Sequence, residues 1–115
     1  MTSAPSDLRP AGTGPVGSQE RLLRVLADPL RMQILTLLAA EQLCTCHLVA
    51  LTGARQTNVS NHLRALRQAG LVDTEPCGRF TYYRLRPEPL AALATSLARL
   101  ADDAREALTH KRPCT

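Results

Sequence analysis

The sequence contains no tryptophan and only three aromatic residues, Phe80, Tyr82 and Tyr83. Its apolar residues are mainly Leu and Ala, which favour helices, whereas aromatic residues favour strands. A chain of 115 residues is long enough for one compact domain but too short for two separate cores. The composition therefore predicts a single, mainly α-helical domain.

Long apolar segments are also absent. No run of 18 apolar residues occurs, so no transmembrane helix is expected. The N-terminal residues lack the basic and apolar regions of a secretory signal. We therefore expect a cytoplasmic protein with no membrane partner, whose cysteines remain thiols. These are Cys44, Cys46, Cys77 and Cys114.

The first 17 residues contain three prolines and three glycines among Ser and Thr, and they offer little apolar area to bury. This composition predicts a disordered arm over residues 1–17. The folded domain is expected over residues 18–110, followed by a flexible tail at 111–115. Ser18 can cap a first helix that begins at Gln19.

Three further helices are predicted before residue 70. Asp28 precedes Pro29, a combination typical of a helix start, and apolar residues recur at helical spacing over 29–40. A short helix is expected over 46–51 and a longer one over 57–69. The inward-facing residues of the longer helix are Val59, Leu63 and Leu66.

The apolar period then changes to that of strands. Residues 71–75 and 80–85 are strand-like and flank the turn sequence 76–79, which predicts a β-hairpin. A last helix should run over 87–108 with an apolar stripe at spacings of three and four. A second copy of the chain would cover this stripe, although packing within one chain is the alternative.

Two short helices joined by a tight turn and followed by a hairpin form a winged helix-turn-helix, whose second helix enters the major groove of DNA. The predicted fold class is therefore mainly α with a β-hairpin, in the order α-α-α-α-β-β-α. Residues 54–86 contain six arginines and two acidic residues, as expected for a surface that binds a polyanion. A merely solvated basic face is the alternative interpretation.

The outward side of the second helix carries polar residues that can exchange hydrogen bonds with base edges, and nearby arginines can bind phosphate. The predicted DNA-binding residues are Gln56, Thr57, Ser60, Asn61, Arg64 and Arg79. His62 lies beside the inward face, so we interpret it as a structural residue. Arg84 and Arg86 are weaker candidates for DNA contact.

Two segments resemble the ArsR/SmtB family of metal-responsive repressors. Residues 27–35 read ADPLRMQIL, similar to the family signature ADPTRLRIL, and residues 58–66 read NVSNHLRAL, similar to its recognition helix. The resemblance covers residues 19–108. It implies a homodimer, joined through its first and last helices, that binds an inverted repeat in double-stranded operator DNA and silences a promoter. Family DNA contacts match Gln56, Thr57, Ser60 and Asn61.

Residues 43–48 read LCTCHL and resemble the ELCVCDL box with which family members bind arsenite, antimonite, cadmium or lead. Thiolates prefer soft ions, and Cys44 and Cys46 form a chelating pair. The resemblance implies As(III) or Sb(III) as inducer, with Cd(II) or Pb(II) as alternatives. Residues i and i+2 of a regular helix lie about 200° apart. We therefore predict that ligation holds or pulls Cys44 out of the first helical turn, and that this strain lowers operator affinity.

The third ligand is not supplied by this box, because Val49 stands where relatives often have Cys. Cys114 in the tail is the first candidate, and an external thiol is another. Cys77 is expected to be too distant, and His47 is a poor ligand for arsenite. The His/Asp/Glu zinc site of other family members has no counterpart on the last predicted helix.

Three other functions compete with this interpretation. A thiol redox or persulfide sensor on the same fold is the main alternative, although a Cys44–Cys46 disulfide would close a strained ring. An enzyme is not expected, because the sequence has no Cys-x-x-Cys beside a βαβ pattern, no phosphate loop and no acid–base cluster. A helical interaction module would bind its partner without the steep salt dependence of a repressor on DNA.

Overall fold

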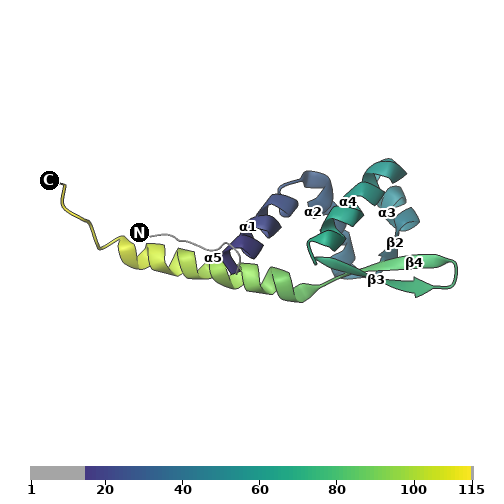
Figure 1. Ribbon diagram of the computed structural model, residues 1–115. Coiled ribbons are helices and arrows are strands. Elements are labelled where there is room, and N and C mark those ends of the chain that lie inside the picture. Colours follow the sequence, from purple (N-terminus) through teal and green to yellow (C-terminus); the bar gives the residue numbers. More distant parts are fainter. Residues whose placement is uncertain (1–14, 115) are drawn as a thin grey trace.

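The computed structural model describes residues 15–114 and contains, over that range, five helices and three short strands (Figure 1). Their bounds are Pro15–Leu26 (α1), Pro29–Ala40 (α2), Leu43–Cys44 (β2), Thr45–Thr52 (α3), Gln56–Gln68 (α4), Val72–Cys77 (β3), Phe80–Leu85 (β4) and Pro87–Ala107 (α5). The predicted fold class, a mainly helical chain with a β-hairpin wing, is confirmed.

The helix boundaries differ from the predicted ones by a few residues. α1 begins at Pro15, four residues before the predicted start, so the last three residues of the predicted arm are helical. The rest of that arm, residues 1–14, lies outside the described residues. α3 and α4 each begin one residue earlier than predicted, which places Gln56 in the first turn of α4.

α2 starts where its capping sequence predicts. The Asp28 carboxylate accepts hydrogen bonds from the backbone N–H groups of Leu30 and Arg31, at 2.9 and 3.1 Å. Pro29 follows at the first helical position, where its missing N–H costs nothing. These local contacts stabilise the N-terminus of the helix.

The core lies between α2, α3, α4 and the wing. Its fully buried side chains include Ile34, Leu48, Leu63, Leu66 and Leu71. Burial of each such side chain contributes about 1.5–3 kcal/mol relative to exposure. α3 ends at Gly53, whose φ of 74° lets its N–H donate to the Val49 carbonyl at 2.9 Å. This turn sets the angle between α3 and α4.

The sheet has the strand order β2-β4-β3 and is antiparallel throughout. The sequence did not predict β2, which pairs Leu43 with Tyr83 and Cys44 with Tyr82. β3 runs to Cys77, two residues beyond the predicted end. It can include Pro76 because β3 is an edge strand, so the missing N–H can point away from the ladder.

α5 leaves the wing, passes the N-terminal end of α1 and extends to the far end of the molecule (Figure 1). Leu93 is buried against the core, whereas Leu97, Leu100 and Leu108 are exposed, with Leu100 at 65%. An apolar stripe therefore remains uncovered in the single chain. Over the part of the chain that is described, no helix combines the length and apolarity needed to cross a membrane.

Candidate thiol site and nucleic-acid interface

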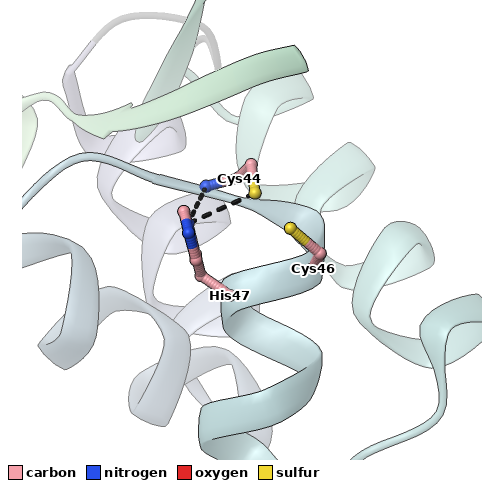
Figure 2. Close-up of side chains that lie close together, drawn as sticks. All are labelled: Cys44, Cys46 and His47. Carbon is pink, nitrogen blue, oxygen red and sulfur yellow. Dashed lines mark hydrogen bonds between the residues drawn. The ribbon is translucent and has the colours of Figure 1, made fainter. Parts of the chain in front are cut away.

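The two box cysteines lie on either side of the start of α3. Cys44 is the last residue of β2 and occupies the N-cap position with extended backbone, φ −91° and ψ 171°. Cys46 is the second residue of the helix. Figure 2 shows the two sulfur atoms pointing toward one another. Donor atoms of Cys44, Cys46 and His47 all lie within 4.8 Å of each other.

This arrangement bears on the expected mechanism. Two cysteines two residues apart would diverge inside a helix, but Cys44 already lies outside α3 because the helix begins at Thr45. The sulfurs therefore converge while α3 stays regular. This geometry agrees with ligation that holds Cys44 outside the helical turn, and it does not require ligation to pull Cys44 out.

The two thiols have different environments. Cys44 is buried, at 4% exposure, whereas Cys46 is exposed. Burial raises the pKa of Cys44, but hydrogen bonds from the Cys46 thiol and from the backbone N–H groups of His47 and Cys46 outweigh it, so the net pKa is lowered. The pKa of Cys46 is raised, first because its thiol donates to Cys44 and then by desolvation. Cys44 is thus the sulfur that favours the thiolate, the nucleophilic form.

His47 completes the cluster from the first turn of α3. Its Nδ1 accepts a hydrogen bond from the Cys44 backbone N–H at 3.1 Å and lies 3.2 Å from the Cys44 sulfur. Its ring packs against Tyr82 of β4 with the ring centroids 6.0 Å apart. Imidazole suits borderline divalent ions better than it suits As(III). His47 belongs to a cluster that could hold such an ion, although its Nδ1 already accepts the Cys44 N–H.

The other two cysteines are not brought to this cluster in the described chain. Cys77 is exposed on β3. Cys114 follows α5, and the C-terminal end of α5 lies at the opposite end of the molecule from β2 and α3 (Figure 1). A contribution from Cys114 would have to come from the tail of another subunit.

The face of α4 opposite the core carries five of the six predicted DNA-binding side chains. Gln56, Thr57, Asn61 and Arg64 are exposed, and Ser60 is half-buried. Arg64 donates to the Asn61 side-chain oxygen at 3.4 Å. The neighbouring Asn58 is also exposed on this helix, although it is not among the predicted DNA-binding residues. Its place next to Val59, outside the inward-facing set of this helix, could have indicated its exposure from the sequence.

The wing arginines differ in how their charge is compensated. Arg79 is exposed beside Gly78 at the hairpin turn. Arg84 pairs with Asp73 at 2.8 Å and with Glu75 at 3.4 Å, and the Asp73 hydrogen bond raises the pKa of Arg84. Because two acids already neutralise Arg84, Arg79 is the stronger candidate for a phosphate contact. Arg86 lies 3.8 Å from Glu88.

His62 has the structural role expected of it. It lies on α4, half-buried, and its Nδ1 accepts a hydrogen bond from Arg31 Nε at 3.0 Å. Its other nitrogen lies 3.9 Å from the Asp28 carboxylate. These contacts connect α4 to the start of α2 and leave His62 engaged with the protein.

Residues 28–74 match the profile of the family described as "Bacterial regulatory protein, arsR family". The arsenic resistance transcriptional regulator ArsR1 of Pseudomonas putida is 38% identical over 68 residues, which are 58% of this chain and 53% of that protein. The HTH-type transcriptional repressor SmtB of Mycobacterium tuberculosis is 39% identical over 84 residues, 72% of this chain and 62% of that protein. The chain spans about half to three fifths of the length of these relatives.

One solved structure is similar to this chain over most of the length of both chains. The homodimeric winged helix-turn-helix DNA-binding domain from Mycobacterium bovis is 30% identical, with a TM-score of 0.63, and the match covers 85% of this chain and 90% of that one. The chain belongs to the arsR family. The family is described as one of bacterial regulatory proteins, which agrees with the prediction of a regulator that binds DNA.

Proposed function

We propose that this arsR-family chain is a homodimeric repressor that binds an inverted repeat in operator DNA and releases it when a thiophilic ion binds Cys44 and Cys46. The observation that carries the proposal is the convergence of the two sulfurs at the start of α3, the first helix of the DNA-binding unit (Figure 2). The inducers are As(III) or Sb(III), with Cd(II) or Pb(II) as further ions of matching softness.

DNA binding is supported by the exposed polar face of α4 and by the charge around it. The bases would be read by Gln56, Thr57, Ser60 and Asn61, whose side chains can donate and accept hydrogen bonds. Arg64 and Arg79 would bind phosphate, since neither forms an ion pair within the described residues. A helix in the major groove and a wing along the backbone is the usual docking geometry of this fold.

Dimerisation is supported by the apolar stripe of α5. Leu97, Leu100 and Leu108 are exposed in the single chain, and a second α5 would cover them. A two-fold dimer places two α4 helices on successive half-sites, which accounts for an inverted repeat. The relative from Mycobacterium bovis is described as homodimeric, in agreement with this proposal.

The connection between ion and DNA runs through the sheet. Cys44 belongs to β2, whose only partner among the described strands is β4 of the wing. An ion that draws Cys44 toward Cys46 therefore acts directly on the strand that positions the wing. The dimer would have one conformation with high DNA affinity and one with low DNA affinity. The ion causes release if it binds more tightly to the conformation with low DNA affinity.

The test is operator release by the purified protein under reducing conditions, followed by fluorescence anisotropy on a double-stranded site selected from random DNA. Arsenite, antimonite, cadmium, lead and zinc are added separately, and the thiophilic ions are expected to release the DNA. Cys44→Ser and Cys46→Ser should bind DNA as the wild type does but fail to release it. Cys77→Ser, which also removes one thiol, serves as the matched control.

The proposal is wrong if either serine variant at the site still releases DNA at wild-type ion concentrations. The main alternative, a thiol redox or persulfide sensor, gives a different pattern. Such a sensor should ignore arsenite under reducing conditions and release DNA when an oxidant or a persulfide is added.

A further inference from the structure

Arg31 connects three helices through one guanidinium group. It lies in the first turn of α2 and is half-buried. Its Nη1 donates to the backbone carbonyl of Val25 in the last turn of α1, at 3.3 Å, and its Nε donates to Nδ1 of His62 on α4, at 3.0 Å. Because the guanidinium is planar and rigid, these two hydrogen bonds fix how far α4 lies from the end of α1.

His62 is held on both sides of its ring. An arginine cannot accept a hydrogen bond, so the contact with Arg31 requires that Nδ1 of His62 carry no proton. The ring proton is then on Nε2, which lies 3.9 Å from the Asp28 carboxylate. That carboxylate also accepts the backbone N–H groups that begin α2. The orientation of the imidazole is therefore set by the start of α2.

The orientation of α4 depends on such directional contacts. Its inward face consists of the buried apolar residues Val59, Leu63 and Leu66. Apolar burial is non-directional, so it holds the helix against the core but specifies its rotation about its own axis only weakly. His62 directly follows Asn61, one of the proposed base contacts. A hydrogen bond to His62 therefore fixes the direction in which the DNA-reading side chains of α4 point.

A second polar contact holds the end of α4. Arg21 of α1 donates to the carbonyl of Gln68, the last residue of α4, at 3.2 Å. α1 is in turn bonded to α5, because the Gln19 amide donates to the Ser96 hydroxyl. α5 carries the apolar stripe proposed as the dimer interface. Polar contacts thus form a continuous path from the proposed dimer interface to the proposed DNA-reading helix.

Building on the proposed function, we infer that Arg31 and His62 are positioning residues that set the orientation of α4 relative to the dimer interface. They thereby determine which separation of operator half-sites the dimer accepts, without touching DNA themselves. In a two-fold dimer a tilt of α4 acts twice, once in each subunit, on the separation of the recognition helices. One base pair between the half-sites corresponds to about 3.4 Å along the duplex, so small tilts of α4 matter.

The experiment compares operators that differ only in the spacing of their half-sites. The full chain is titrated by fluorescence anisotropy against the selected inverted repeat and against versions with one base pair inserted or removed between the half-sites. The wild type is expected to lose about tenfold or more in affinity on either altered operator, because a rigid dimer cannot follow the shift. Urea unfolding and sedimentation velocity check the folding and the oligomeric state of each variant.

Variants of the two positioning residues should relax this spacing preference. His62→Leu removes the acceptor, and should bind the selected operator about tenfold more weakly, with the penalty for altered spacing reduced to about threefold or less. His62→Asn keeps an acceptor oxygen near the position of Nδ1 and should restore most of the wild-type preference. Arg31→Lys retains the charge but not the planar group that bonds to two helices, so it should relax the preference as His62→Leu does.

Arg24→Met is the matched control, since it removes an arginine whose ion pair, with Glu20, lies within α1. It should keep the wild-type affinity and the wild-type spacing penalty. Arg31→Lys decides the outcome if His62→Leu does not fold.

The inference is overturned if either relaxing variant, once folded, keeps the wild-type spacing penalty, because a loss of affinity alone indicates a general structural role. It is also overturned if His62→Asn loses the preference as fully as His62→Leu, or if the wild type binds all three operators equally. The proposed function fails separately, when the wild type binds no inverted repeat or when thiophilic ions do not release it.

Discussion

Cys44 and Tyr82 are directly opposed residues of the β2–β4 ladder, so one backbone pairing joins a thiol of the candidate site to the wing. The Tyr82 ring also packs against His47, the third donor of the cluster. A two-residue strand thus connects the start of α3 with the hairpin. Tyr82 makes both contacts: its backbone pairs with Cys44 of β2, and its ring packs against His47 of α3.

Tyr82→Ala should weaken the response to cadmium while DNA binding is retained. The substitution removes the ring that positions His47, and an aromatic pair contributes about 0.5–1.5 kcal/mol, equivalent to roughly 2–10-fold in concentration. The measurement is the cadmium concentration that releases half of the operator. Tyr82→Phe keeps the ring and should behave as the wild type; equal losses in the two variants would show that the hydroxyl, not the ring, matters.

Arg64→Ala should reduce operator affinity and lower the steepness of its salt dependence. Removing one arginine–phosphate interaction reduces the slope of log affinity against log salt by about one. Binding isotherms at several salt concentrations measure this slope. Lys111→Ala removes one positive charge from the segment after α5 and should leave the slope unchanged. An unaltered slope in Arg64→Ala would exclude a phosphate contact at that residue.

Leu100→Glu should produce a monomer with operator affinity reduced by roughly tenfold or more. A charge on the exposed stripe of α5 would have to be desolvated in a dimer, and a monomer can occupy only one half-site at a time. Sedimentation velocity and anisotropy measure the two effects on the same sample. Met32→Glu places the same charge on the exposed side of α2 and should stay dimeric. A dimeric Leu100→Glu variant would place the subunit interface elsewhere.

Asp28 should make folding stability sensitive to acid. The backbone N–H of Arg31 lowers the pKa of Asp28 below its ordinary 3.8, with a further contribution from His62. Its contribution is therefore fully present above pH 3.8 and is lost as the pH falls through the lower pKa of the folded state. Urea unfolding at a series of pH values measures it.

Asp28→Asn is the informative variant here, because it keeps a capping oxygen but cannot ionise. The difference in unfolding free energy between the wild type and this variant should shrink as the pH falls below 3.8. Asp103→Asn, at an exposed position of α5, is the control for a generic loss of charge. A difference that stays constant across this pH range would contradict the cause assigned to the lowered pKa.

The sequence by itself determined the helical framework and the DNA-binding unit. Asp28 and Pro29 define the start of α2, and the spacing of Val59, Leu63 and Leu66 defines the inward face of α4. Capping and apolar periodicity act between residues close in the chain, so they can be read without knowing the fold. The thiol pair was identified in the same way, by residue type and spacing.

Only the tertiary structure decided how those thiols face one another. β2 has only two residues, too few for a recognisable strand pattern in the sequence. It forms because β4 lies beside it. That pairing keeps Cys44 extended and outside α3, which reverses the divergence expected within a helix. A cavity beside the sulfurs likewise requires the wing to return to the start of α4. Such contacts depend on residues about 40 positions apart along the chain, and local sequence preferences carry no information about them.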